Sequence, residues 1–245
     1  MATAISIQNL SFSYGEQTVL NQLNLEVQAG ERFGIFGPNG AGKTTLMSII
    51  TGLIKYHTGS VRIQDLEVKD NSTAVKKILG FVPQDFSFYQ ELSPAENLAF
   101  FGAWAGLNAR QIKSKTSELL QVMALDHVKN KPVQHFSGGM KRRVNLAIAV
   151  LANPAIVILD EPTVGVDVQT RHAIIDYLKQ LNKRGTTLLY TSHQLHEAED
   201  LCNRFALMDE GRILVNDSLD NLLQQHHQQG LEGLFLQLTG RAYRH

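Results

Sequence analysis

Apolar and polar residues alternate along the first part of the chain, and this alternation predicts β-strands. It is clear over residues 5–7 and again over 23–27, and residues 59–63 and 66–68 form the pattern of a further hairpin. We therefore expect an antiparallel β subdomain built largely from the N-terminal part of the chain.

Helical spacing replaces the alternation in the middle of the chain. Ser93-Pro94-Ala95-Glu96 is a capping box with proline at the first helical position, and an apolar run follows it through Trp104. A second helix is predicted over residues 109–124, and apolar residues recur at helical spacing after Ser137. These segments predict a helical subdomain.

Strands and helices then alternate. Residues 155–159 and 186–192 are rich in β-forming apolar residues, and between them residues 168–182 form an amphipathic helix. Such alternation predicts an α/β fold with a mostly parallel sheet, whose phosphate sites lie at the carboxyl ends of the strands. The polar stretch 224–230 predicts an exposed helix end or loop. His226 and His227 lie within it, without partners at a spacing typical of metal ligands.

Composition restricts the class of protein. The chain has 245 residues of which 43% are hydrophobic, enough for one large core, so we expect one domain with subdomains. Its 23 basic and 23 acidic residues balance, which gives no footprint for nucleic acid. Cys202 is the single cysteine and fits a reducing compartment. Without a run of 18 apolar residues or a signal pattern, the sequence predicts a cytoplasmic protein that reaches membranes only through a partner.

The segment GPNGAGKT is the strongest chemical signal in the chain. It follows an apolar strand over residues 32–36 and precedes a helical pattern from Thr45, the context in which a phosphate loop works. Its glycines let backbone N–H groups point at one anion, while Lys43 reaches the phosphates and the hydroxyl of Thr44 suits Mg²⁺. The predicted nucleotide-binding residues are Gly37, Pro38, Asn39, Gly40, Ala41, Gly42, Lys43, Thr44 and Thr45.

Two carboxylates end the apolar strand Ile156-Val157-Ile158-Leu159. Buried charges are costly, so Asp160 and Glu161 at a strand end indicate a metal and a reaction rather than stability. Asp160 is predicted to hold Mg²⁺ together with Thr44, and Glu161 to polarise the attacking water.

A further segment resembles a known family. Phe136-Ser137-Gly138-Gly139-Met140 precedes the acidic strand and resembles the signature of the ATP-binding cassette (ABC) ATPases, usually written LSGGQ. With GPNGAGKT before it and Thr191-Ser192-His193 after it, the order of motifs resembles that family over nearly the whole chain. The resemblance implies a P-loop NTPase core, a flanking antiparallel β subdomain and an inserted helical subdomain.

The resemblance also implies a homodimer that shares its ATP sites. Ser137, Gly138 and Gly139 would face the γ-phosphate of ATP held by the other subunit, and Asp167 falls where the family has its subunit contact. A serine-capped helix N-terminus is physically suited to an anion. The implied ligands are ATP and Mg²⁺.

Three further roles rest on the same resemblance. Gln84 matches the glutamine that senses Mg²⁺ and the attacking water, and His193 the histidine that contacts the γ-phosphate. Tyr14 matches the aromatic residue that stacks on adenine, although from sequence alone ordinary packing of that ring is the commoner reading.

Departures from the family pattern resemble its export-type members. Phe136 and Met140 replace the usual leucine and glutamine, Val164-Gly165 replaces the commoner Ser-Ala, and the tail over 231–241 also resembles that subfamily. The implied partition is a nucleotide core over 1–84 and 152–215, a helical subdomain over 85–151 and a tail over 216–245.

The implied function is ATP-driven transport through a separately encoded integral membrane subunit, with the chain on the inner face of the membrane. One alternative is a soluble ABC ATPase of translation or DNA repair, which usually carries two cassettes or a long coiled coil, and the chain has neither pattern. A second is a regulatory module without turnover, which the presence of Glu161 and His193 disfavours.

Aromatic residues are concentrated where a membrane partner would bind. We expect more than half of these rings to fill the subdomain core and the rest to form an exposed surface for the partner. They are Phe86, Phe88, Tyr89, Phe100, Phe101 and Trp104.

Overall fold

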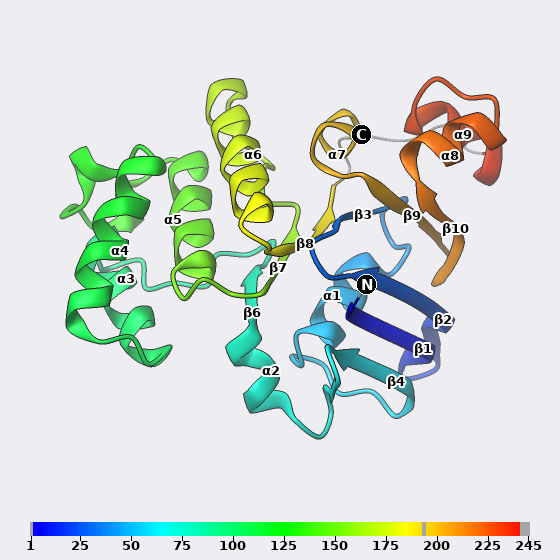
Figure 1. Cartoon of the computed structure of the whole chain (residues 1–245), viewed down its shortest axis with the longest axis horizontal. Helices are drawn as coiled ribbons and strands as arrows, with labels where there is room; N and C mark the ends of the chain where they lie inside the picture. Colours follow the sequence, from blue (N-terminus) through cyan, green and yellow to red (C-terminus); the bar gives the residue numbers. More distant parts are fainter. Residues whose placement is uncertain (1, 193–194, 241–245) are drawn as a thin grey trace.

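The computed structural model describes residues 2–192 and 195–240, and two sheets organise them (Figure 1). The strands are β1 (Thr3–Tyr14), β2 (Gln17–Gln28), β3 (Arg32–Phe36), β4 (Thr58–Ile63), β5 (Leu66–Glu67), β6 (Leu79–Val82), β7 (Ile156–Asp160), β8 (Thr187–Thr191), β9 (Arg204–Asp209) and β10 (Arg212–Ser218).

The central sheet has the order β10-β9-β3-β8-β7-β6 over the described residues. All of its neighbouring strands run parallel except β10 and β9, which form an antiparallel hairpin. The predicted mostly parallel sheet is therefore confirmed. Its order brings the carboxyl ends of β3, β6, β7 and β8 to one edge.

The second sheet is antiparallel, with the order β2-β1-β4-β5. Ile5 pairs with Val27 and Ile7 with Leu25, so the alternating residues from the two strands point to the same face. This confirms the strands and the hairpin predicted from alternation.

The helices follow the predicted order. They are α1 (Lys43–Ile50), α2 (Ser72–Ile78), α3 (Pro94–Trp104), α4 (Ala109–Val122), α5 (Gly138–Val150), α6 (Val168–Lys183), α7 (Leu195–Leu201), α8 (Leu219–Gln225) and α9 (Leu231–Thr239), with 3₁₀ turns η1 (Asp126–Val128) and η2 (Val133–His135). In Figure 1, α3, α4 and α5 form a green group to one side of the central sheet.

Most predicted helix boundaries are confirmed. The Ser93 hydroxyl accepts from the backbone N–H of Glu96 and the Glu96 carboxylate accepts in return, which completes the capping box of α3. The helix predicted over 109–124 is shorter than expected, because Met123 is its C-cap and Ala124 has a left-handed φ of 51°.

Two hydrophobic clusters lie on opposite sides of the central sheet. One includes Ile5 and Leu46, so it joins the antiparallel sheet and α1 to the central sheet. The other includes Leu98, Val144 and Leu178, so it joins α3, α5 and α6 to the sheet and makes the helical group part of the same globule.

Several elements were not predicted from the sequence, namely α2, β6, α7, β9, β10, α8 and α9. Helix α2 buries only Val75, which is too little for a visible periodicity. In the tail, Leu231, Leu234 and Phe235 of α9 are buried in the core cluster. The polar stretch before α9 lies between α8 and α9, as predicted.

Candidate phosphate-binding and catalytic site

The loop between β3 and α1 is closed by glycines that admit no side chain. Gly37 has a φ of 157°, and a Cβ on it would lie 2.0 Å from the backbone oxygen of Met208 in β9. Gly42 has a φ of 102°, and a Cβ there would meet Leu20 at 2.9 Å. The loop therefore packs against its own scaffold at both ends and turns directly into α1.

The ammonium group of Lys43 lies inside this loop. The side chain is 7% exposed, and its Nζ donates to the backbone oxygens of Gly37 at 2.8 Å and Pro38 at 3.0 Å. Burial lowers the pKa of Lys43, while the nearby carboxylates of Glu161 and Asp160 oppose this. The loop thus contains a cation aimed at the place where phosphates would bind.

Asp160 lies at the carboxyl end of β7 and is 2% exposed. Its Oδ1 accepts a hydrogen bond from the Thr191 hydroxyl at 2.6 Å, and Thr44 also hydrogen-bonds its side chain. Burial raises the pKa of Asp160, and the hydrogen bonds from Thr191 and Thr44 oppose that rise only in part.

This oxygen set fits Mg²⁺. Among the described residues no group of three or more histidine, cysteine, aspartate and glutamate side chains could hold a metal by itself. Mg²⁺ is usually bound by one or two carboxylates together with substrate phosphates and water, so Asp160 beside the Thr44 hydroxyl is a sufficient protein contribution. The same finding gives no support to a metal at His226 and His227.

Glu161 has an unusual backbone. Its φ is 51°, a left-handed conformation that costs a non-glycine residue about 1–3 kcal/mol. Its backbone N–H donates to the backbone oxygen and the hydroxyl of Thr191, both at 3.2 Å. Gln84, just beyond the end of β6, donates from its Nε2 to the Glu161 Oε2 at 3.4 Å. The ends of β6, β7 and β8 thus place Gln84, Asp160 and Glu161 together, near Lys43.

Thr191 is a residue whose role the sequence analysis missed. Its hydroxyl is hydrogen-bonded to the Asp160 carboxylate and accepts from the Glu161 N–H, so it fixes both acids. A hydroxyl at the end of the strand next to the acidic one was the available signal, but strand order decides that they meet.

Arg142 is a second missed residue. It is buried on α5, and its Nη1 donates to the backbone oxygen of Pro83 at 3.2 Å, next to Gln84. Its Cζ lies 5.0 Å from the centroid of the Phe86 ring, and burial lowers the pKa of the guanidinium. Helix α5 is thereby attached to the segment that carries Gln84.

The helix N-terminus at Ser137 is exposed and capped. Its hydroxyl accepts from the Met140 backbone N–H at 3.3 Å, as the sequence predicts. A Cβ on Gly138 would meet no heavy atom within 4 Å, and one on Gly139 would come no closer than 3.7 Å to Val166. The chain's own packing therefore does not require either glycine. Figure 1 shows α5 in the helical group, whereas α1 lies beside β1 and β2.

The remaining predicted residues are spread over the molecule. Tyr14 ends β1 with 52% exposure and contacts Phe12 edge to face, so most of its ring is not used in packing. Asp167 is exposed and caps α6 by accepting from the Thr170 N–H at 2.9 Å, which gives it a structural role whatever else it contacts. His193 lies outside the described residues.

The expectation about the aromatic residues is wrong in part. None of the six is fully buried: Phe86, Phe88 and Phe101 are half-buried, and Tyr89, Phe100 and Trp104 are exposed. The inward stripe of α3 consists of smaller residues, among them Leu98 and Gly102, so the rings at positions 100 and 104 point elsewhere.

Four of these rings form a continuous surface, which we call the aromatic patch: Tyr89, Phe100, Phe101 and Trp104. Tyr89 and Phe100 lie 4.9 Å apart, Phe100 and Phe101 5.3 Å, and Phe101 and Trp104 6.5 Å between ring centroids. Trp104 is 76% exposed. A patch of this kind is typical of an interaction site.

Comparison with known sequences agrees with this geometry. The sequence profile of the ABC transporter family matches residues 20–164. The linearmycin resistance ATP-binding protein LnrL of Bacillus subtilis (strain 168) is 37% identical over 211 residues, which cover 86% of this chain and 68% of that protein. The Nod factor export ATP-binding protein I of Paraburkholderia xenovorans is 39% identical over 220 residues, covering 90% and 72%.

Solved structures give the same result. The ATP-binding subunit of an ABC transporter superposes with a TM-score of 0.89 at 29% identity, covering 96% of this chain and 99% of that one. A dimeric ATP-binding cassette in a post-hydrolysis state with ADP and Pi gives a TM-score of 0.81 at 28% identity, covering 88% and 98%.

The Asp160 carboxylate should lower the stability of the folded chain at neutral pH, although its chemistry suits it to hold Mg²⁺. The folded-state pKa of Asp160 lies above that of the unfolded chain, so the stability that this group contributes is present below the ordinary aspartate pKa of 3.8 and is lost as pH rises through the folded-state pKa. Asp160→Asn should therefore raise the thermal midpoint at neutral pH without nucleotide or Mg²⁺, and the gain should shrink as the pH falls toward 3.8.

The matched control is Asp217→Asn. Hydrogen bonds from the Ser218 backbone and Asn221 lower the pKa of Asp217, so this change should leave the midpoint unchanged or lower it at neutral pH. An Asp160→Asn chain no more stable than the parent at neutral pH would contradict the prediction.

Proposed function

Since the chain belongs to the ABC transporter family of ATP-binding proteins, we propose that it is the ATP-hydrolysing subunit of an exporter. The observation that carries the proposal is the cluster of Lys43, Asp160, Glu161 and Gln84 around one phosphate loop. Export is supported by relatives whose names state resistance to linearmycin and export of Nod factor.

Each residue has a role that follows from its position. Lys43 and the N–H groups of the loop bind the β- and γ-phosphates, and Asp160 and Thr44 hold Mg²⁺. When held there, the ion would supply positive charge against the charge that develops on the phosphates. Glu161 orients the attacking water and accepts its proton, and Gln84, which bonds the Glu161 carboxylate, positions that carboxylate. Tyr14 stacks on the adenine.

A head-to-tail homodimer completes the site. The exposed, serine-capped N-terminus of α5 offers N–H groups to an anion, and the absence of contacts around Gly138 leaves room for one to approach from outside the chain. Ser137, Gly138 and Gly139 therefore contact the γ-phosphate of the partner's ATP, while Asp167 contacts the partner and His193 supplies a further phosphate contact.

The aromatic patch is the surface that we assign to the integral membrane subunit. The described ranges contain no helix with the length and apolar character needed to cross a membrane. The patch lies on α3 and the segment before it, which supports a partner bound beside α3 and a chain held by that partner at the inner face of the membrane. ATP-driven closure of the dimer would then move α3 and with it the partner.

Removing the carboxylate of Glu161 tests the proposal. Glu161→Gln preserves shape but cannot take the proton, so ATP turnover should fall about 10²- to 10⁴-fold while ATP binding persists. The variant should accumulate as an ATP-bound dimer in size-exclusion chromatography. Turnover near that of the parent would exclude Glu161 as the base.

A charge at Gly138 tests the shared site. Gly138→Asp has space in the folded chain, and an acid in the first turn of α5 stabilises the helix by about 0.3–1 kcal/mol, so the thermal midpoint should hold or rise. Turnover should fall at least about tenfold, because the carboxylate repels the partner's γ-phosphate.

Mixing inactive chains tests the geometry of that site. A dimer of one Lys43→Ala chain and one Gly138→Asp chain has one intact composite site, so activity should reappear on mixing. The control mixes the double variant with the parent chain, which leaves no intact site in the mixed dimer. Full activity of that dimer, isolated with two different affinity tags, would contradict the head-to-tail arrangement.

The aromatic patch predicts that two activities can be separated. Phe100→Ala with Trp104→Ala should leave ATP hydrolysis by the isolated chain unchanged, since neither ring contacts the phosphate site, and should abolish recovery of the chain with native membranes. Leu214→Ala, an exposed apolar residue on β10, is the control for loss of apolar surface. Normal membrane recovery of the double variant would place the partner elsewhere.

A further inference from the structure

A carboxylate that the proposed mechanism does not use is buried behind the catalytic site. Glu197 on α7 is 7% exposed. Its Oε2 accepts hydrogen bonds from the hydroxyl of Thr163 and, at 3.0 Å, from the hydroxyl of Tyr190, and its Oε1 pairs with the Arg171 Nε at 2.8 Å. We call these four residues the Glu197 cluster.

The three partners of Glu197 come from three different catalytic segments. Thr163 lies two residues after Glu161. Tyr190 immediately precedes Thr191, the residue that bonds both Asp160 and the Glu161 N–H. One carboxylate is thus attached both to the segment that carries Glu161 and to the strand that carries Thr191.

Arg171 attaches the third segment. It lies in the first turns of α6, and its Nη2 donates to the backbone oxygen of Val166 at 3.5 Å. Val166 belongs to the loop over 164–167 that ends at Asp167, which we have assigned to the subunit contact. Through Arg171, Glu197 therefore holds the loop that faces the partner subunit.

Three of the four residues of the cluster are buried, whereas the Arg171 side chain is 26% exposed and contacts Glu197 as an ion pair without hydrogen-bond geometry. Thr163 and Tyr190 are 2% and 0% exposed, and burial raises the pKa of the Tyr190 phenol, so its O–H stays protonated and donates. Hydrogen bonds in such surroundings are strong and directional. A buried ion pair is weak evidence for stability, because apolar residues of similar volume often stabilise as well or better. An apolar core would not hold the segments of Thr163, Tyr190 and Arg171 in one fixed geometry, whereas this cluster does.

We propose that Glu197 is a positioning residue that couples the subunit-contact loop over 164–167 to Glu161 and Thr191, so that dimer contact sets the geometry of the attacking water. The inference rests on the proposed function, since it assumes hydrolysis at Glu161 and contact through that loop. Glu197 touches neither ATP nor water. Its effect passes through Thr163, Tyr190 and Arg171.

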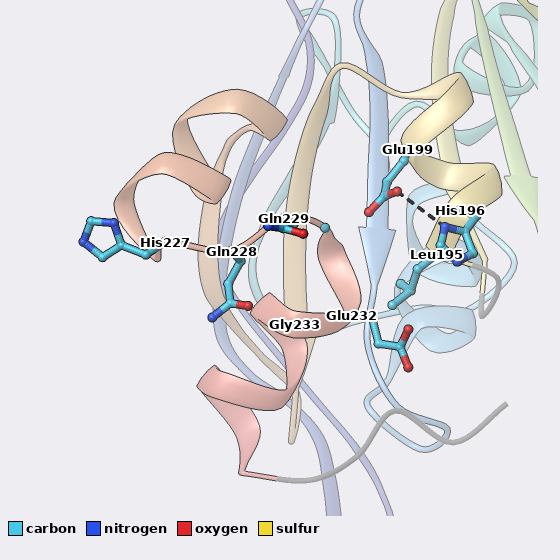
Figure 2. A pocket seen from close by; sticks show the side chains of 9 residues that line it. Leu195, His196, Glu199, His227, Gln228, Gln229, Glu232 and Gly233 are labelled. Atoms are coloured by element: carbon cyan, nitrogen blue, oxygen red, sulfur yellow. Dashed lines mark ion pairs between the residues drawn. The ribbon is translucent and has the colours of Figure 1, made fainter.

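Two substitutions on α7, each of which removes one carboxylate, give the test. Glu197→Gln keeps the shape but loses the ion pair with Arg171 and one acceptor. Glu199→Gln is the matched control on the same helix, because Glu199 faces away from the catalytic segments. It accepts from the Leu231 N–H at 2.6 Å and pairs with His196 at 3.7 Å, beside the pocket shown in Figure 2.

We expect kcat for ATP hydrolysis to fall about 10- to 100-fold in Glu197→Gln, with KM for ATP within about twofold of the parent, since the phosphate loop is untouched while the water is misplaced. ATP-dependent dimerisation should persist. Glu199→Gln should keep the parent kcat. Tyr190→Phe removes one hydroxyl from the core and should likewise lower kcat while leaving KM for ATP nearly unchanged. Thr163→Ser keeps its hydroxyl and should retain the activity that Thr163→Val loses.

Combining changes separates positioning from stability. If the cluster acts as a unit, Glu197→Gln with Thr163→Val should lose little more kcat than the worse single variant. If the role were purely structural, the loss of activity would follow the fall in thermal midpoint and activity would return on cooling. The same behaviour would then be seen in Glu197→Gln and in Glu199→Gln. That result would overturn the inference, as would a parent-like kcat in folded Glu197→Gln. If Glu197→Gln does not fold, Tyr190→Phe decides by the same criteria.

Failure of the proposed function looks different. The parent chain is assayed first beside Lys43→Ala, and absence of ATP turnover that depends on Lys43 would reject the proposed function itself. Turnover that depends on Lys43 but is indifferent to the Glu197 cluster would reject only this inference.

Discussion

The cost of burying the Asp160 carboxylate is the constraint on which the rest of the site depends. The group lies at the end of a strand that is buried throughout, and burial raises its pKa. Thr191, Thr44 and Lys43 offset part of that cost with hydrogen bonds and charge. What remains is an electrostatic imbalance that a divalent cation and its attached phosphates would relieve, so the stability of the folded site and ligand binding are linked. The loop glycines serve the same end, because they let the loop turn directly into α1 and place Lys43 within electrostatic reach of this carboxylate.

The predicted site residues fall into two groups within the chain. Lys43, Asp160, Glu161 and Gln84 meet at one edge of the central sheet, whereas the capped N-terminus at Ser137 belongs to the helical group. The two parts are nevertheless joined within the chain, because Arg142 on α5 holds the carbonyl before Gln84 and stacks on Phe86. If α5 contacts a second ATP, as we propose, its movement would reach the segment that carries Gln84 through the bond to Pro83. The Glu197 cluster provides a second connection, from the loop over 164–167 to the other end of the site. If the proposed dimer forms, both connections would transmit structural changes between its two ATP sites.

The helical group also connects the site to its surroundings. Its inward residues on α3 are small or aliphatic and close the gap to α4 and α5, which leaves the large rings of the aromatic patch at the surface. In a chain with balanced charge, this patch is a specific apolar feature rather than part of a general electrostatic attraction. A partner docked there would be moved by the same helices that carry Ser137 and contact Gln84. On this account, packing and the hydrogen bonds of Arg142 link phosphate chemistry to the partner's movement.

The sequence by itself determined the α/β class, most helix and strand positions, the phosphate loop and the two carboxylates after β7, because glycine freedom, capping and period are local properties. The limits of the nucleotide core, helical subdomain and tail stay predictions from resemblance. Only the tertiary structure decided that Thr191 bonds Asp160 and Glu161, that Phe86 faces Arg142, and that Glu197 collects three distant segments. Except for Tyr190 and Glu197, which are seven residues apart, each of these contacts joins residues far apart in the chain. Strand order and helix packing, which no local pattern encodes, bring them together. The expectation that most of the aromatic rings would be buried failed for the same reason, since which face of α3 turns inward depends on the helices that pack against it.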